Sequence, residues 1–486
     1  MAEAARLAQQ VPRRWRQGIA LDPRYQEPKG QASFWARARK LFWSWWPWFL
    51  VSLVTAYDNR WGWAFSTGAM AFVSYLLTPT ESAPRYGLDH EFSVDSDEFI
   101  TTITGATGVP ILPDNRIDVL NNGDEFYPVM LEEIARAQTS ITIEAYIYWA
   151  GEIGRRFAEA LAAKASEGIP VKILLDAVGS ATIGAEILET LEKGGCQLAW
   201  YNRIHWYTIG QFNHRTHRKS LIIDGRIGFT GGAGIADVWL GSAQSPEHWR
   251  DMQIRIAGPA VTPLQTGFAR NWLKTTGELL SGATYYPEHD CEGNPPSRGY
   301  GMAGLPVQTV MSSPESGASS VRVMHYLPIV CARRSIYISN PYFVPDQAAI
   351  DTLVDARRRG VDVRIMVAGR HNDTWLARQN SRRLYGRLLR AGIQILEYNK
   401  TFMHQKTMVV DGLWASIGTT NFDNRSFAHN EETSVCVRDA GLAGYMEGVF
   451  HNDMRACDRV ELETWRQRGL WTKSLEAIAS LLEEQV

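Results

Sequence analysis

The stretch HRKSLIIDG at residues 217–225 recurs later in the chain as HQKTMVVDG at residues 404–412. Each copy begins with a histidine and a lysine two positions apart, continues with apolar residues and ends in Asp-Gly. Side chains alternate between the two faces of a strand, so the histidine and the lysine should point to the same side. The pattern H-x-K-x-x-x-x-D therefore predicts a buried strand that carries an imidazole and an ammonium group at its start.

Three further features recur in the same order before each copy. The matched segments are 140–146 with 335–342, 168–176 with 360–367, and 195–202 with 392–399. Each is a short apolar or alternating run, and helical stretches lie between them. Chance does not keep four features in order, so the chain contains an internal duplication. Strands that alternate with helices predict an α/β unit with a parallel or mixed sheet.

A second strand is expected after each motif, over 227–232 in the first copy and 415–421 in the second. Both end in small residues, which let the backbone approach a ligand closely. Asn421 adds an amide donor in the second copy. The candidate substrate-binding residues are therefore Gly231, Gly232, Gly418, Thr419 and Asn421.

Paired histidines and lysines suit the transfer of a phosphoryl group. Negative charge spreads over the phosphate oxygens in the transition state, and Lys219 and Lys406 would stabilise it. One of His217 and His404 would attack phosphorus, and the other would protonate the departing alcohol. Since the lysines supply positive charge, neither a metal nor a cofactor is expected. The near-symmetry of the copies leaves open which histidine is the nucleophile.

Composition narrows the class of protein. The chain has 486 residues and a net charge of -2, which argues against nucleic-acid binding through bulk electrostatics. Its five cysteines are scattered and form no C-x-x-C pair, so neither a disulfide framework nor a zinc site is expected.

The N-terminal region has the composition of a membrane anchor. Residues 1–40 are rich in Lys and Arg, and residues 41–80 form two apolar, uncharged segments separated by Asp58-Asn-Arg60. A spanning helix needs about 17–25 such residues, so we expect a membrane hairpin with a cytoplasmic N-terminus. A hairpin that enters one leaflet without crossing, or a packed pair in a protein core, are the alternatives.

The expected organisation is therefore as follows: a basic segment 1–40, a membrane hairpin 41–80, a first catalytic domain 110–282, a linker 283–318, a second catalytic domain 319–460 and a C-terminal tail 461–486. The linker is rich in Gly, Pro and Ser. The tail carries Leu475, Ile478, Leu481 and Leu482 at helical spacing, which predicts an amphipathic helix that packs on the body or lies on the membrane.

These motifs resemble the phospholipase D superfamily and, within it, the bacterial cardiolipin synthases. The resemblance runs from about residue 119 to residue 436 and includes RTHRK at 215–219, WRD at 249–251, NPYF at 340–343 and GTTNFDNRS at 418–426. It implies two pseudo-symmetric α/β/α sandwich domains. It also implies a catalytic set formed by the two motifs, namely His217, Lys219, Asp224, His404, Lys406 and Asp411.

The resemblance also implies roles for single residues. His217 would be the nucleophile of a phosphohistidine intermediate, and His404 the acid and later the base. Lys219, Lys406 and Asn421 would hold the phosphate. An acid would orient each histidine; Asp251 and Glu432 match, although Glu431 leaves the register open. The first copy departs from the family pattern at Gly234, where many members carry Asn.

The leading functional hypothesis is phosphatidyl transfer at a bacterial inner membrane, in which two phosphatidylglycerol molecules give cardiolipin and glycerol. The expected partners are membrane phospholipids and the bilayer, and no nucleic acid. A phospholipase D that hydrolyses headgroups would use the same residues. A nuclease of the same superfamily and a non-catalytic membrane scaffold are the remaining alternatives.

Overall fold

A computed structural model describes residues 45–58, 60–76, 87–88, 90–203, 215–289, 299–313 and 319–479. The predicted basic segment 1–40 lies outside the described residues. The chain divides into two compact units, one that contains the first two described helices and one that contains everything from residue 80 onward.

The first unit consists of helices α3 (Trp45–Tyr57) and α4 (Trp61–Leu76). They contact each other, and the hydroxyl of Ser52 donates a hydrogen bond to the carbonyl of Ala64 at 2.7 Å. In the described part of the chain, no helix is both long and apolar enough to cross a membrane. The membrane hairpin over 41–80 stays a prediction.

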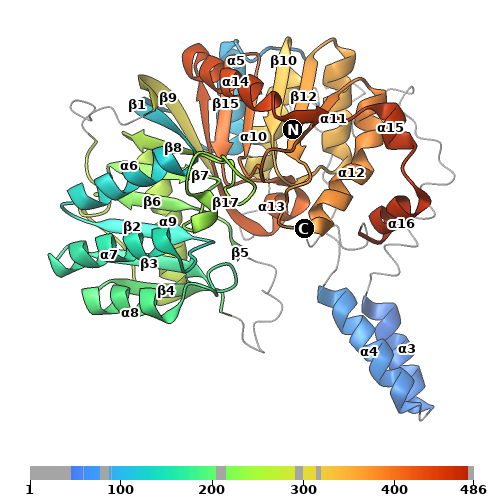
Figure 1. Cartoon of the computed structure of the whole chain (residues 1–486), viewed down its shortest axis with the longest axis horizontal. Helices are drawn as coiled ribbons and strands as arrows, with labels where there is room; N and C mark the ends of the chain where they lie inside the picture. Colours follow the sequence, from blue (N-terminus) through green and yellow to red (C-terminus); the bar gives the residue numbers. More distant parts are fainter. Residues whose placement is uncertain are drawn as a thin grey trace, which may run out of the picture. The chain divides into compact units, whose positions relative to one another are not determined.

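The second unit is built on one mixed sheet of 16 strands (Figure 1). The strands are β1 (Leu112–Asn121), β2 (Ile141–Ala145), β3 (Val171–Asp176), β4 (Gln197–Tyr201), β5 (Arg215–Thr216), β6 (Ser220–Ile223), β7 (Ile227–Gly231), β8 (Met252–Ala257), β9 (Tyr300–Ser312), β10 (Ser335–Ser339), β12 (Asp362–Ala368), β13 (Gln394–Tyr398), β14 (Thr407–Val410), β15 (Trp414–Gly418), β17 (Asn430–Arg438) and β18 (Cys457–Arg459). Strands β11 (Phe343–Val344) and β16 (Phe422–Asp423) form a separate pair.

The strand order confirms the duplication. From one edge to the middle it is β4-β3-β2-β6-β7-β8-β1, and from the other side it is β13-β12-β10-β14-β15-β17-β9, with β18 added at that edge. All four matched sequence features correspond to a strand in each half. Strands β2, β3 and β4 pair in parallel in the first half, and β10, β12 and β13 do so in the second. The remaining neighbours within each half pair antiparallel.

Two expectations about boundaries need correction. The histidine and lysine of each motif precede the strand, because β6 begins at Ser220 and β14 at Thr407. The expected linker 283–318 contains the 13-residue strand β9, which pairs with both β1 and β17 in the middle of the sheet. The glycines in this segment favoured the prediction of a linker. Gly301 is needed within the strand because a Cβ there would lie 1.9 Å from a carboxylate oxygen of Asp118.

Helices cover both faces of the sheet. Helices α9 (Val261–Thr276) and α14 (Ala440–Met454) share one apolar cluster that extends across both halves. The opposite face is covered in the first half by α6 (Asn122–Arg136), α7 (Glu152–Ser166) and α8 (Ala185–Gly194), and in the second half by α5 (Asp97–Thr107), α10 (Ser319–Cys331), α11 (Gln347–Arg358) and α12 (Trp375–Arg390).

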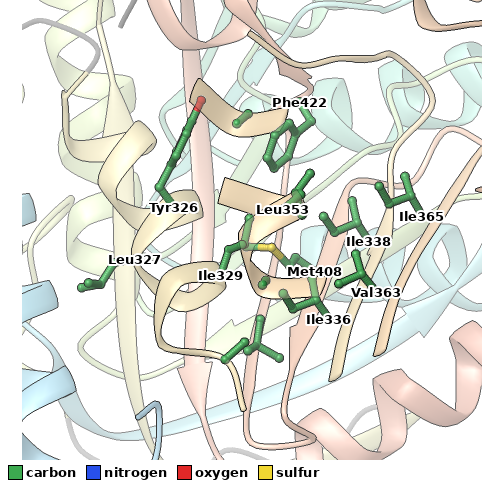
Figure 2. Packing of buried hydrophobic residues seen from close by; sticks show 14 of the residues in the cluster. Tyr326, Leu327, Ile329, Ile336, Ile338, Leu353, Val363, Ile365, Met408 and Phe422 are labelled. Carbon is green, nitrogen blue, oxygen red and sulfur yellow. The ribbon is translucent and has the colours of Figure 1, made fainter. Parts of the chain in front are cut away.

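Alternation along the strands builds these cores. Figure 2 shows Ile336 and Ile338 of β10 beside Val363 and Ile365 of β12, all directed toward the helices of the second half. Tyr337, between the first two, belongs to another cluster on the opposite face. A period of two side chains therefore gives the sheet two apolar faces, as a three-layer fold requires.

The C-terminal tail packs on the body. Helices α15 (Leu462–Arg466) and α16 (Leu470–Ala479) contact α12, and the indole of Trp465 donates to the carbonyl of Arg382 at 2.8 Å. The sequence left open whether this segment packs on the body or lies on the membrane, and helices α15 and α16 pack on the body. Leu481 and Leu482 lie outside the described residues.

Candidate active site

The two predicted histidines each bind an acid from the opposite half of the duplication. Nδ1 of His217 lies 3.0 Å from both carboxylate oxygens of Glu432, and Nδ1 of His404 lies 3.0 Å from Oδ2 of Asp251. Backbone hydrogen bonds also join the two halves: the backbone amide of His217 donates to the carbonyl of Glu431, and the backbone amide of His404 donates to the carbonyl of Arg250. Each half therefore supplies the acid that binds the histidine of the other half.

Both acids have further donors that fix their orientation. Glu432 accepts hydrogen bonds from the hydroxyl of Thr419 and the amide of Asn430. Asp251 accepts from the indole of Trp239 at 2.9 Å and the backbone amide of Met252 at 2.8 Å.

These contacts keep the acids ionised. Burial acts to raise the pKa of both carboxyl groups, but the contact with its histidine and the nearby lysine outweigh burial, so each pKa lies below its ordinary value. An ionised carboxylate accepts a hydrogen bond from Nδ1–H of the imidazole, so the proton stays on Nδ1 and Nε2 keeps its lone pair for chemistry.

Both imidazoles are neutral near pH 7. Burial is the largest cause, and the two ammonium groups add to it; the pKa of His217 falls to about 4 and that of His404 to about 3. The charges of Lys219 and Lys406 both act on each histidine. The two motifs therefore share one electrostatic environment, although they are far apart in the sequence.

The two lysines are buried close to each other. Nζ of Lys219 donates to the carbonyl of His217 at 3.0 Å, and Nζ of Lys406 donates to the carbonyl of His404 at 2.7 Å. Burial lowers the pKa of Lys219 to about 7, with repulsion from Lys406 as the next cause, and lowers the pKa of Lys406 to about 8. A bound anion would relieve both effects, so the arrangement suits a phosphate.

Most of the predicted turn residues surround the acids. A Cβ at Gly232 would lie 2.2 Å from Oδ1 of Asp251, and one at Gly418 would lie 2.2 Å from the carbonyl of Thr433. A Cβ at Gly231 would lie 2.4 Å from the carbonyl of Met252. The three glycines therefore make room for Asp251 and for the backbone of the neighbouring strands, whereas Thr419 binds Glu432 through its hydroxyl. Asn421 is buried, and its side-chain oxygen has no hydrogen-bond partner among the described residues.

The motif aspartates are not brought to the histidines. Asp224 and Asp411 follow the far ends of β6 and β14, with positive φ angles of 54° and 56°. Their carboxylates accept hydrogen bonds from three consecutive backbone amides each, 138–140 and 333–335. The geometry is that of a turn anchor at each end of the duplicated strand.

The sequence matches the family model described as "Cardiolipin synthase, PLD-like domain" over residues 130–272 and 329–454. The chain belongs to this family. Both histidines, both lysines and both orienting acids lie inside the matched residues.

Named relatives cover most of the chain. It is 33% identical over 376 residues to "Cardiolipin synthase 2" of Staphylococcus epidermidis. This match covers 76% of this chain and 74% of the relative. It is 32% identical over 378 residues to "Cardiolipin synthase" of Listeria innocua, over 77% of this chain and 76% of the relative. Among solved structures, a phosphatidylserine synthase of Haemophilus influenzae has the same fold, with a TM-score of 0.60, 14% identity and coverage of 80% of this chain and all of that chain.

Gly234, at which the resemblance predicts an asparagine in many members, has no room for a side chain in this chain. A Cβ at this position would lie 2.8 Å from the carbonyl of Ile147 and 2.9 Å from its Cβ. The amide of Ile235 also donates to the same carbonyl at 3.0 Å. The backbone after β2 therefore occupies the space that an asparagine side chain would need.

Sequence reasoning missed the aromatic residues of the site. The ring of Tyr146 lies 5.2 Å from that of His217, with the ammonium group of Lys219 5.5 Å from its centroid. The corresponding distances of Tyr342 are 6.2 Å to His404 and 6.0 Å to the ammonium group of Lys406. The signal was present, because both tyrosines follow matched strands of the duplication.

His404 has additional aromatic neighbours. Trp239, Trp249 and Phe402 lie with ring centroids 5.6, 5.8 and 5.6 Å from its imidazole. These rings fix the imidazole on the sides that Asp251 does not cover. Within the ranges that the structure describes, no group of three or more His, Cys, Asp or Glu side chains is arranged to hold a metal ion.

Proposed function

We propose that this chain transfers a phosphatidyl group between two phosphatidylglycerol molecules, giving cardiolipin and glycerol, through a phosphohistidine intermediate. The observation that carries the proposal is the pair of histidine–acid contacts that cross between the halves, with Lys219 and Lys406 beside them. Family membership and the names of the relatives support the same reaction.

His217 is the better nucleophile. Its Nε2 has no hydrogen-bond partner among the described residues, whereas Nε2 of His404 lies 3.0 Å from Nζ of Lys406. In the first step, Nε2 of His217 forms a bond to phosphorus and the bond to the glycerol oxygen breaks. The departing oxygen takes the electron pair and receives a proton from His404.

The second step runs in reverse with a new alcohol. His404, now neutral, accepts a proton from a glycerol hydroxyl of the second lipid, and that oxygen attacks phosphorus. The phosphorus–nitrogen bond breaks and its electron pair returns to His217. The phosphodiester charge favours the protonated imidazole, so bound substrate raises the pKa of His404 from its low value in the free protein.

We also propose that α3 and α4 enter the lipid of the bacterial inner membrane, with the N-terminus in the cytoplasm. Neither helix contains a charged residue, and the side chains of Phe49, Val54 and Phe65 are exposed. The hydroxyls of Ser52, Thr55, Ser66 and Thr67 all donate to backbone carbonyls, which suits a medium without water. A tethered enzyme meets lipid alcohols at high effective concentration in competition with water.

The full chain in mixed micelles with phosphatidylglycerol tests the reaction. Mass spectrometry of the lipids should find cardiolipin and an equal amount of glycerol. Phosphatidic acid without cardiolipin would mean that the protein hydrolyses headgroups instead. His217→Ala and His404→Ala should abolish both products, whereas His289→Ala, a half-buried histidine bound to Thr262, should retain them.

The intermediate has a separate test. Rapid acid-free quenching and intact-mass analysis should find a phosphatidyl adduct on the wild type and none on His217→Asn. An adduct that persists in His217→Asn but disappears in His404→Asn would reverse the two assigned roles.

A further inference from the structure

The two halves of the site share their geometry but differ in charge. Near Tyr146, the buried carboxylate of Asp176 lies 3.6 Å from the guanidinium of Arg215, which neutralises it. Near Tyr342, the hydroxyl donates to both carboxylate oxygens of Asp373 at 2.5 Å. Asp373 is exposed and forms no ion pair with any described residue.

The Tyr342–Asp373 pair belongs to the half that contains His404. The ring of Tyr342 lies against the imidazole, and Asp373 acts electrostatically on Lys406 and on Tyr146. Burial, followed by the charge of Asp373, raises the pKa of Tyr342 well above its ordinary value. The phenol therefore stays protonated and keeps donating to the carboxylate.

A carboxylate without a paired cation attracts hydroxyl groups and repels phosphate. An ionised carboxylate is an acceptor only, and its second lone pairs remain free for donors on a ligand. The phosphoryl group is already attracted to the two lysines, while the alcohol must reach His404 to exchange its proton. The alcohol side of the reaction therefore lies next to Asp373.

We propose that Tyr342 and Asp373 form a subsite for the free hydroxyl groups of a polyol headgroup, on the His404 side of the phosphorus. The proposal rests on the proposed function and specifies its alcohol as a polyol. The leaving and entering alcohols occupy the same subsite, because the second step is the reverse of the first. No covalent step involves either residue, so both are specificity-determining residues.

The test compares two lipid donors that differ only in the hydroxyls of the leaving alcohol. The full-length protein in mixed micelles is given equal amounts of phosphatidylglycerol and phosphatidylpropanol together, so that phosphatidylglycerol supplies the accepting hydroxyl in both cases. The initial rates of glycerol and propanol release then give the relative kcat/KM values of the two donors. The ratio of the two values isolates recognition of the hydroxyls, whether the phosphatidyl group passes to lipid or to water. The wild type should prefer phosphatidylglycerol by at least about tenfold, since a site built for a hydroxyl rejects the analogue that lacks it.

Asp373→Asn and Tyr342→Phe should each lower this ratio about tenfold, mainly by slowing cleavage of phosphatidylglycerol. The matched control is Asp362→Asn, because Asp362 accepts from Tyr337 at 3.3 Å in the same half but at the opposite end of strands β10 and β12. It should leave the ratio unchanged. Thermal melting of each variant checks that the fold is intact.

An unchanged ratio in both folded variants, or an equal preference of the wild type for the two lipids, would overturn the subsite. Formation of phosphatidic acid alone would overturn cardiolipin synthesis but leave the ratio measurable, so the two proposals fail separately. Failure of the wild type to cleave either lipid would overturn both.

Discussion

At the scale of residues, the two histidine motifs are held by different chemistry. The first is bound by buried acids at successive positions: Arg215 lies near Asp176, Thr216 donates to Glu144, His217 binds Glu432 and Arg218 binds Glu431. In the second, Phe402 and Met403 replace Arg215 and Thr216, and aromatic rings surround His404. The duplicated histidines therefore have different neighbours, which allows them different roles in one reaction.

The crossed acids should be essential to turnover. We expect Glu432→Gln to lower kcat by about 10²–10⁴-fold, because an amide no longer holds the imidazole as a neutral Nδ1–H donor. Glu431→Gln is the matched neighbour, since the carboxylate of Glu431 pairs with Arg218 and only its backbone carbonyl, which the substitution keeps, contacts His217. It should lower the melting temperature more than the activity of the folded protein. Steady-state kinetics and thermal melting of both variants separate these effects; equal losses of kcat would contradict the orienting role.

The buried lysines predict how activity depends on pH. In the substrate complex, where the phosphodiester keeps the acid His404 protonated, kcat should fall as the pH is lowered toward about 4, because His217 becomes protonated and loses its lone pair. Lys219 has a lowered pKa of about 7 and Lys406 one of about 8, so their charge is lost, and kcat/KM should fall, as pH rises through 7 to 8. Rates measured from pH 3.5 to 9.5, an interval of about six units, would define both limbs.

A second variant assigns the alkaline limb. A guanidinium keeps its charge throughout this range, so Lys219→Arg should move the fall in kcat/KM to higher pH, toward the value set by Lys406 alone. An alkaline limb that stays at the wild-type position in an active Lys219→Arg protein would exclude Lys219 as its cause.

At the scale of elements, the duplicated strand is anchored at both ends for different purposes. Its N-terminal end presents the histidine and the lysine, and its C-terminal end is fixed by Asp224 in the first half and by Asp411 in the second. Both aspartates adopt positive φ, a conformation that Asp and Asn tolerate better than most side chains. The spacing within the motif is thus set by the length of the strand that joins a reactive end to a turn.

We expect Asp224→Asn to cost about 1–3 kcal/mol in the free energy of unfolding, because a charged acceptor of three backbone amides is lost while the backbone conformation stays allowed. The kcat of the folded protein should remain within about threefold of the wild type. Urea unfolding and kinetics at low temperature measure the two quantities. A large fall in kcat without loss of stability would return Asp224 to the catalytic set.

At the scale of the whole molecule, one continuous sheet makes the two halves interdependent. Strands β1 and β9 pair in the middle, and the cluster under α9 and α14 contains residues from both halves. Because Asp251 and Glu432 each serve the opposite histidine, neither half contains a complete site. This arrangement explains why the chain carries both copies in one unit of structure.

The α3–α4 pair gives a prediction about the location of the whole chain. Val54→Lys together with Phe65→Lys places charges at exposed apolar positions and should greatly weaken co-flotation with phosphatidylglycerol vesicles. Trp375→Lys, at an exposed position of the second unit, is the matched control and should float like the wild type. Unchanged flotation of the double variant would contradict insertion of these helices into lipid.

The sequence by itself determined the duplication, the strands β2, β3, β4, β6 and β7 with their counterparts in the second half, and the histidine and lysine pairs. These features follow from local periodicity and spacing, which are written along the chain. The strand β9 escaped prediction because Gly301 and Gly304 break the apolar alternation that marks a strand.

Only the tertiary structure decided which acid serves which histidine, that Glu432 and not Glu431 is the partner of His217, and that Asp224 and Asp411 lie away from both. Such pairings depend on how the halves cross, and contacts between residues about 150–215 positions apart leave no local signal. The charge asymmetry between Asp176 and Asp373 is decided in the same way, because neutralisation requires a cation placed by another segment.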